Sequence, residues 1–158
     1  MAAILSLACI FLPWLGAGMV WLSGDERSRQ INLLAVSSSL LTAATSLTLT
    51  TVTSSTPAVR FSLGNSFGDF LLVADGLGVI IVLIASVIGS LTVIFALDYM
   101  RHSPHQHARF YALILFFIGA MNGIGLSGSL LFTFIFWEIT ALCSYLLISF
   151  HNDDPRAV

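Results

Sequence analysis

The sequence predicts an all-α membrane protein with about five transmembrane helices and a short external β-hairpin-like loop between the second and third helices. Hydrophobic residues make up 57% of the 158 residues, charged residues only 9%, and the mean hydropathy is +0.95. A soluble domain carries roughly 25% charged residues, so this chain has too few to cover a surface in water. Five segments are long and apolar enough to cross a hydrocarbon core of roughly 30 Å. We therefore expect residues 1–158 to form a single membrane domain.

The first two spans are expected at residues 3–22 and 31–52. Pro13 and Gly16 are tolerated in membrane helices and are expected to bend the first span. The second span is rich in serine and threonine, and a helix lying on the membrane surface is the alternative. We favour a span because no charged residue occurs from position 30 to position 59, and because hydroxyl side chains suit close helix packing and can bond carbonyls one turn back. These residues are Ser37, Ser38, Ser39, Thr42, Thr45 and Ser46.

The remaining spans are expected at residues 77–97, 110–126 and 130–150. Only the serine- and glycine-containing residues 127–129 separate the last two spans, which predicts a tight antiparallel helical hairpin.

The connection between the second and third spans carries a strand-like pattern. Apolar and polar side chains alternate over residues 59–63, Gly64 and Asn65 offer a turn, and residues 66–70 follow as a second strand. This pattern predicts a short β-hairpin lying on the membrane surface.

The orientation in the membrane follows from the arginines, because the chain has no lysine. With five spans, Arg60 lies alone on one side of the membrane. The other five lie on the opposite side: Arg27, Arg29, Arg101, Arg109 and Arg156. The positive-inside rule places these five in the cytoplasm, so the N-terminus and the hairpin loop are expected outside.

The composition also argues against several classes of function. The formal net charge is −2 and there is no basic run, so nucleic acid is not an expected partner. No nucleotide-binding, haem or iron–sulfur motif is present, so we expect no cofactor and no redox chemistry in this chain. Cys9 and Cys143 lie in apolar stretches and are expected to be small fillers in helix packing.

Glu138 is the main candidate for chemistry. It is the ninth residue of the fifth span, roughly 12 Å from one end at about 1.5 Å per residue, and so lies near the middle of the membrane. A charged carboxylate at that depth costs at least ~2.5 kcal/mol, so it must face protein or water, pair with a cation, or keep its proton. A carboxyl group that can exist in either state is what a proton or cation relay requires. A hydrogen bond to a neighbouring helix, without further function, is the alternative.

Three other residues are candidates to support Glu138. Tyr145 follows it by seven residues and so shares its helix face, where it would extend a hydrogen-bonded path or simply pack. Ser144 is less well aligned. Asp75 precedes the third span and is either a proton-entry group or an acid at the start of a helix, and Asp98 is most simply a boundary residue. No basic residue lies within a predicted span, so a cationic partner at depth must come from another chain.

Three histidines lie close together between the third and fourth spans: His102, His105 and His107. Metal binding is conceivable, but Pro104 and the missing fourth ligand argue against it. We expect a solvated interfacial loop and no metal site.

Residues 136–150, with the sequence FWEITALCSYLLISF, resemble a signature of the antiporter-like membrane subunits. This family includes large subunits of respiratory complex I (subunit L type), of Mrp sodium/proton antiporters and of membrane-bound hydrogenases. Segments 73–77, 98–100, 109–112 and 119–123 agree with the family in order and spacing. The resemblance covers residues 70–156 well and the first 70 loosely, as the N-terminal part of such a subunit.

The resemblance implies a proton-translocating, non-redox subunit of a translocase complex of the NADH-quinone oxidoreductase type, in a bacterial inner membrane. In that family, the glutamate at the position of Glu138 is paired with a lysine on a later, broken helix. The implied partners are therefore the lipid bilayer and other membrane subunits, one of which supplies buried lysines. The implied transported ions are protons, or protons and sodium.

The chain departs from the family pattern at its end, because residues 153–158 stand where the sixth helix of the family would begin. We expect either the front piece of a split subunit or a truncated product. Two alternative functions stay open. One is a piece of an Mrp-type sodium/proton antiporter, whose branch the segments 136–140 and 119–121 resemble slightly more. The other is a non-conducting assembly or scaffold chain, including a membrane partner for inorganic-carbon uptake.

Overall fold

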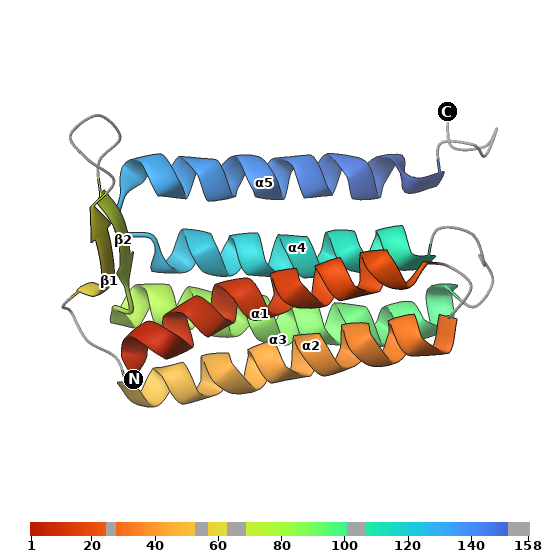
Figure 1. The fold of residues 1–158 in the computed structure, drawn as a ribbon, viewed down its shortest axis with the longest axis horizontal. Coiled ribbons are helices and arrows are strands. Elements are labelled where there is room, and N and C mark those ends of the chain that lie inside the picture. Colours follow the sequence, from red (N-terminus) through yellow and green to blue (C-terminus); the bar gives the residue numbers. More distant parts are fainter. Residues whose placement is uncertain (25–27, 53–56, 63–68, 101–106, 152–158) are drawn as a thin grey trace.

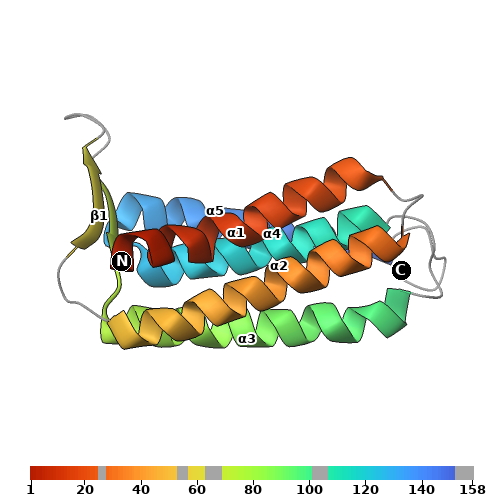
Figure 2. The same cartoon turned by 60° about the horizontal axis from the view of Figure 1, so that its bottom comes forward.

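The computed structural model describes residues 1–24, 28–52, 57–62, 69–100 and 107–151. Five long helices lie side by side, and successive helices run in opposite directions (Figures 1 and 2). They are α1 (Ala2–Ser23), α2 (Ser28–Leu49), α3 (Gly76–Tyr99), α4 (His107–Leu126) and α5 (Leu130–Ile148). All five are long and apolar enough to cross a bilayer, so the five predicted spans are confirmed and the chain is an integral membrane protein.

Several helix ends differ from the prediction. The first turn of α2 contains Arg29 and the first turn of α4 contains Arg109, because both helices begin before their apolar segments do. At the other end of the chain, α5 stops at Ile148 and gives way to a short 3₁₀ helix, Ser149–His151. A second 3₁₀ turn, Thr50–Val52, completes the span that begins with α2. Hydropathy locates the part of a helix in lipid, whereas backbone hydrogen bonding continues into the interface.

Asp75 determines where α3 begins. Its backbone is extended and its Oδ1 accepts a hydrogen bond of 2.7 Å from the backbone N–H of Gly78. This N-cap satisfies one of the N–H groups that a helix leaves unpaired in its first turn. The helix therefore starts at Gly76.

The predicted β-hairpin is present at the end of the molecule that also holds the N-terminus (Figure 1). Strand β1 (Pro57–Ser62) pairs antiparallel with β2 (Asp69–Val73), and the Arg60 guanidinium forms an ion pair of 2.7 Å with Asp69. The second strand was expected at residues 66–70 and lies later in the chain, because Leu72 of β2 is fully buried in the core. The proposed turn at residues 64–65 lies outside the described residues.

Strand β2 is also attached to the turn between α4 and α5. The backbone N–H of Gly128 donates to the carbonyl of Leu71 at 2.8 Å, and Leu72 forms a bridge with Ser127. The turn itself occupies only residues 127–129, so the predicted tight helical hairpin is confirmed. The hairpin strands, this turn and the start of α5 therefore form one connected unit.

Helices α1 to α4 surround a shared core, and α5 packs mainly on α4 at the outside (Figure 1). The core has two apolar clusters, one at each end of the bundle. The cluster at the hairpin end includes Ile10, Leu49, Leu72, Val79, Val82 and Leu126. The cluster at the opposite end includes Val20, Ile31, Val93, Met100, Tyr111 and Leu115.

A polar layer separates the two clusters. Along α3, Ser86 and Ser90 lie between Val82 of one cluster and Val93 of the other. The hydroxyl of Ser90 donates to the carbonyl of Ser39 on α2 at 2.8 Å, so the layer connects neighbouring helices. The hydroxyl groups of α2 bond carbonyls three or four residues earlier, as predicted, at Ser37, Ser38, Ser39, Thr42, Thr45 and Ser46. The serine-rich helix is therefore compatible with a bilayer.

One hydrogen bond in this polar layer compensates for the backbone N–H that Pro13 lacks. Proline has no N–H, so the carbonyl of Cys9, four residues earlier in α1, has no partner within its own helix. The side-chain amide of Asn122 on α4 donates to that carbonyl at 2.8 Å and also bonds Ser86 on α3 at 3.1 Å. The Cys9 thiol donates a hydrogen bond to the Thr45 hydroxyl of α2 at 3.7 Å. All four helices meet at this point.

Replacing Asn122 by leucine should therefore destabilise the chain by about 1–2 kcal/mol, because the buried Cys9 carbonyl loses its donor. The loss should be smaller in a Pro13→Ala background, where the new N–H of residue 13 can bond that carbonyl. Thermal unfolding of the four variants of this cycle in detergent micelles measures the coupling. Equal losses in the two backgrounds would show that Asn122 does not serve the carbonyl freed by Pro13.

Candidate functional site

Helix α5 has one face toward the bundle and one face away from it. Its buried residues are Phe136, Thr140 and Cys143, and they mark the side that packs on the bundle. Glu138 stands two residues from both Phe136 and Thr140, which is roughly 200° around the helix from each. Its side chain is exposed, so Glu138 lies on the face of α5 directed away from α1–α4.

Glu138 lies near the middle of α5, as expected from the sequence. It is the ninth of the 19 residues of α5, a helix about 28 Å long at about 1.5 Å per residue. The carboxyl group is therefore attached at the middle of a helix whose length matches the hydrocarbon core.

The surroundings of Glu138 on this chain are almost entirely apolar. A shallow hollow along α5 is lined by Glu138 together with Leu130, Leu131, Thr133, Phe134 and Trp137. Trp137 and Phe134 are 61% and 60% exposed, so large aromatic surfaces flank the carboxyl group. The hydroxyl of Thr133 donates to the carbonyl of Ser129 in its own helix and is engaged there. Within the described ranges, Arg60 forms an ion pair with Asp69, and no cationic side chain forms an ion pair with Glu138.

The three residues expected to support Glu138 lie in different places. Tyr145 is 67% exposed and lies on the same face of α5, two turns further along. Ser144 instead lines a groove between α3, α4 and α5, beside Met121 and Leu147. Asp75 caps the start of α3. The structure thus groups Tyr145 with Glu138 and separates the other two from it.

The histidine-rich segment is described only at its last member, since His102 and His105 lie outside the described residues. His107 was expected in a solvated loop, and this is wrong: it is the first residue of α4 and only 6% exposed. Its Nε2 lies 2.6 Å from the carbonyl of Met100 at the end of α3, which explains its burial. Among the described residues, no three histidine, cysteine or acidic side chains lie close enough together to hold a metal ion.

Both cysteines are free and buried, as expected for fillers in helix packing. Trp137 and Phe134 also belong to the Glu138 surface, which was not predicted from the sequence. The helical period predicts this for Phe134, because it precedes Glu138 by four residues and so lies on the same side of α5.

The two faces of α5 should respond differently to substitution in the isolated chain. Glu138→Leu should leave the thermal stability in micelles unchanged or higher, because the side chain is exposed in a hollow lined by residues of α5 and its removal makes α5 more apolar. Phe136→Ala should destabilise the chain by roughly 3 kcal/mol, since its ring packs beside Trp14 with centroids 6.0 Å apart. A large loss of stability in Glu138→Leu would mean that α5 is rotated relative to this description.

Parts of this sequence are similar to a described protein family and to curated antiporter subunits. Residues 61–111 match the family described as "NADH-Ubiquinone oxidoreductase (complex I), chain 5 N-terminus". The chain is 40% identical over 90 residues to the Na(+)/H(+) antiporter subunit A1 of Staphylococcus aureus strain bovine RF122 / ET3-1, and equally to that of strain JH9. The aligned region is 57% of this chain and 11% of the relative. The chain thus spans about a tenth of the length of the curated relatives it matches.

The fold also has a counterpart among solved structures. A chain of the membrane-bound sulfane sulfur reductase (MBS), described as an archaeal respiratory membrane complex, superimposes with a TM-score of 0.77 at 20% identity. The match covers 98% of this chain and 32% of the other. The five-helix arrangement thus recurs in part of a larger chain, and the sequence matches above confirm the predicted resemblance to antiporter-like membrane subunits.

Proposed function

We propose that this chain is a proton-translocating membrane module, corresponding to the N-terminal part of an antiporter-like subunit, and that Glu138 carries the transported proton. One observation carries the proposal. A carboxyl group is held at the middle of α5 and directed away from the rest of the chain, among exposed apolar side chains.

The physical argument starts from the cost of that position. A charged acid facing lipid at mid-membrane is unfavourable by roughly 2.5–3.5 kcal/mol on insertion scales. For Glu138 to ionise during transport, protein or confined water must therefore cover this face of α5 in the working assembly. A carboxyl group in such an interface takes up a proton when a neighbouring cation leaves and releases it when the cation returns. That alternation is the elementary step of a proton relay.

The cation must come from outside residues 1–158, which contain no lysine and carry their described arginines at helix ends or on β1. We infer that another membrane segment places a buried lysine opposite Glu138, and that Tyr145 on the same face extends the hydrogen-bonded path. The Staphylococcus relatives carry the word subunit in their names and the MBS chain belongs to a complex. These relatives support the proposal that this chain works in a hetero-oligomeric membrane complex.

Glu138→Gln in the full assembly should reduce proton transport at least tenfold while the complex still assembles, because the amide keeps the shape but cannot release a proton. Transport is measured in vesicles carrying a pH-sensitive dye. Thr133→Val is the matched control, since its hydroxyl lies in the same hollow but is bonded to its own helix. Unchanged transport in Glu138→Gln would favour a scaffold role, including a membrane partner for inorganic-carbon uptake.

Sodium/proton antiport is the second candidate function. The observation that favours it is the 40% identity to Na(+)/H(+) antiporter subunits over 90 residues. The same vesicles distinguish the two functions: antiport requires sodium on the opposite side for proton movement, whereas a redox-driven proton module works without it.

We also propose a bacterial inner membrane as the location, with the N-terminus and the hairpin outside. The structure places Arg60 at the hairpin end and Arg29 and Arg109 at the other, which fits the positive-inside rule in that orientation. In whole cells, an impermeant maleimide should label Arg60→Cys and not Arg29→Cys. Both native cysteines are buried and serve as the unlabelled background. Labelling of Arg29→Cys alone would reverse the orientation.

A further inference from the structure

The end of the bundle opposite the hairpin holds a group of buried polar atoms without hydrogen-bond partners. In the described part of the chain, four buried side-chain oxygen or nitrogen atoms lack a partner. Three of the four lie at this end: Asn32 Oδ1 in the second turn of α2, and His107 Nδ1 and the Tyr111 hydroxyl in the first two turns of α4. Such atoms are rare in folded proteins, so a group of them calls for a physical cause.

The role of each nitrogen of His107 follows from its contact with Met100. A backbone carbonyl can only accept a hydrogen bond, so the Nε2 that lies 2.6 Å from the Met100 oxygen carries a proton and donates it. In the neutral ring, Nδ1 is then a bare acceptor. It is buried, and no group of the described protein donates to it.

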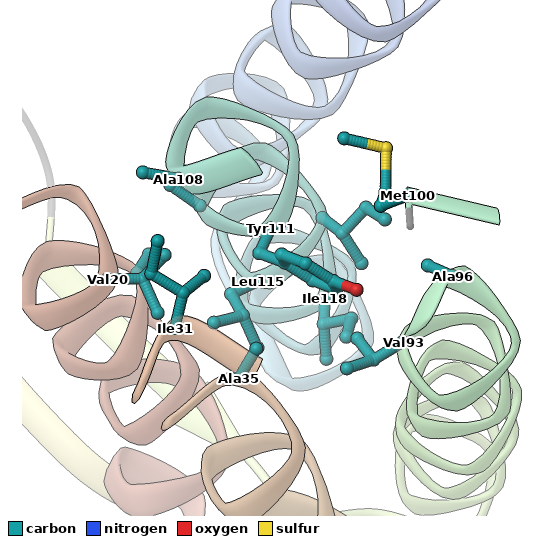
Figure 3. Close-up of a cluster of buried hydrophobic side chains, with 13 residues drawn as sticks. Val20, Ile31, Ala35, Val93, Ala96, Met100, Ala108, Tyr111, Leu115 and Ile118 are labelled. Atoms are coloured by element: carbon teal, nitrogen blue, oxygen red, sulfur yellow. The ribbon is translucent and has the colours of Figure 1, made fainter. Parts of the chain in front are cut away.

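Tyr111 lies one turn after His107 on the same side of α4. The two rings are nearly parallel, with an angle of 14° between their planes and centroids 6.5 Å apart. Figure 3 shows the hydroxyl oxygen directed from α4 toward α3, among the apolar side chains of this cluster. Tyr111 is fully buried in this apolar cluster.

A Tyr111 hydroxyl without a hydrogen-bond partner would lower the stability of the folded chain, since a phenylalanine would fill nearly the same space without a polar atom to desolvate. Internal water is the usual partner for buried polar groups that the protein itself leaves unpaired. Access is short here, because His107 is the first residue of α4 and so lies at the end of the bundle.

We propose that Tyr111 and His107 bind internal water between α3 and α4, with the Tyr111 hydroxyl and the bare Nδ1 of His107 as its ligands. The site is separate from the Glu138 face of α5 and does not depend on the function proposed for that face. It hydrates the interior of the bundle at the end that carries Arg29 and Arg109, and it brings water into contact with a buried imidazole.

Tyr111→Phe tests the proposal, because the two cases predict opposite signs. If water is bound, the variant removes one of its ligands, and the melting temperature of the chain in micelles should fall by about 2–4 °C. If the hydroxyl is dry, the variant relieves an unpaired polar group, and the melting temperature should rise. A rise or no change would overturn the proposal.

The matched control is Tyr145→Phe, whose side chain is 67% exposed and whose melting temperature should not change. A second measurement does not depend on stability. A high-resolution map of the purified chain or its complex should show density within about 3 Å of the Tyr111 hydroxyl oxygen, at a position that no protein atom occupies. Absence of such density in a map that resolves other internal waters would also overturn the proposal.

Discussion

The bond between the Asn122 amide and the Cys9 carbonyl is the constraint on which the bundle depends. A bilayer supplies no water to a carbonyl left without a partner, so every backbone group freed within a span must be satisfied by protein. Pro13 frees such a carbonyl in the first helix, and Asn122 from the fourth helix satisfies it. Because the same amide also bonds Ser86, α1, α3 and α4 are held in one relative arrangement at this level. The apolar clusters above and below then pack around a fixed centre.

The polar groups that stabilise the bundle are different from the carboxyl group proposed to carry protons, and they lie in a different place. The polar groups of α2, α3 and α4 in the central layer bond one another or nearby carbonyls, and within the described ranges none of them contacts Glu138. Glu138 instead lies on the far side of α5, which itself packs mainly on α4. Helices α1–α4 thus act as a rigid base that presents one face of α5. The neighbours that cover that face complete the site.

The sequence was sufficient to predict the spans, the hydroxyl-to-carbonyl bonds of α2 and the placement of Tyr145 with Glu138, because each follows from hydropathy or helical period. It was not sufficient for the direction of Glu138 relative to the bundle. Helix α5 is apolar on nearly all sides, so its sequence carries no strong preference for which side is buried. The register of β2 and the burial of His107 were missed for a related reason. The burial of Leu72 in the core and the contact of His107 with the Met100 carbonyl determine them, and these contacts join segments that are separated in the sequence.

The attachment of Gly128 to Leu71 has a mechanical consequence. At its hairpin end, α5 is joined to α4 by three residues, and that short connection is itself hydrogen-bonded to β2. The first turn of α5 therefore cannot shift without also moving the strand pair. A helix held by hydrogen bonds at one end tilts most readily about that end, so we expect the displacement of α5 to increase toward Ile148. A force on the end of α5 near Ile148 would then displace the Glu138 carboxyl group by about half as much as that end, because Glu138 lies halfway along the helix.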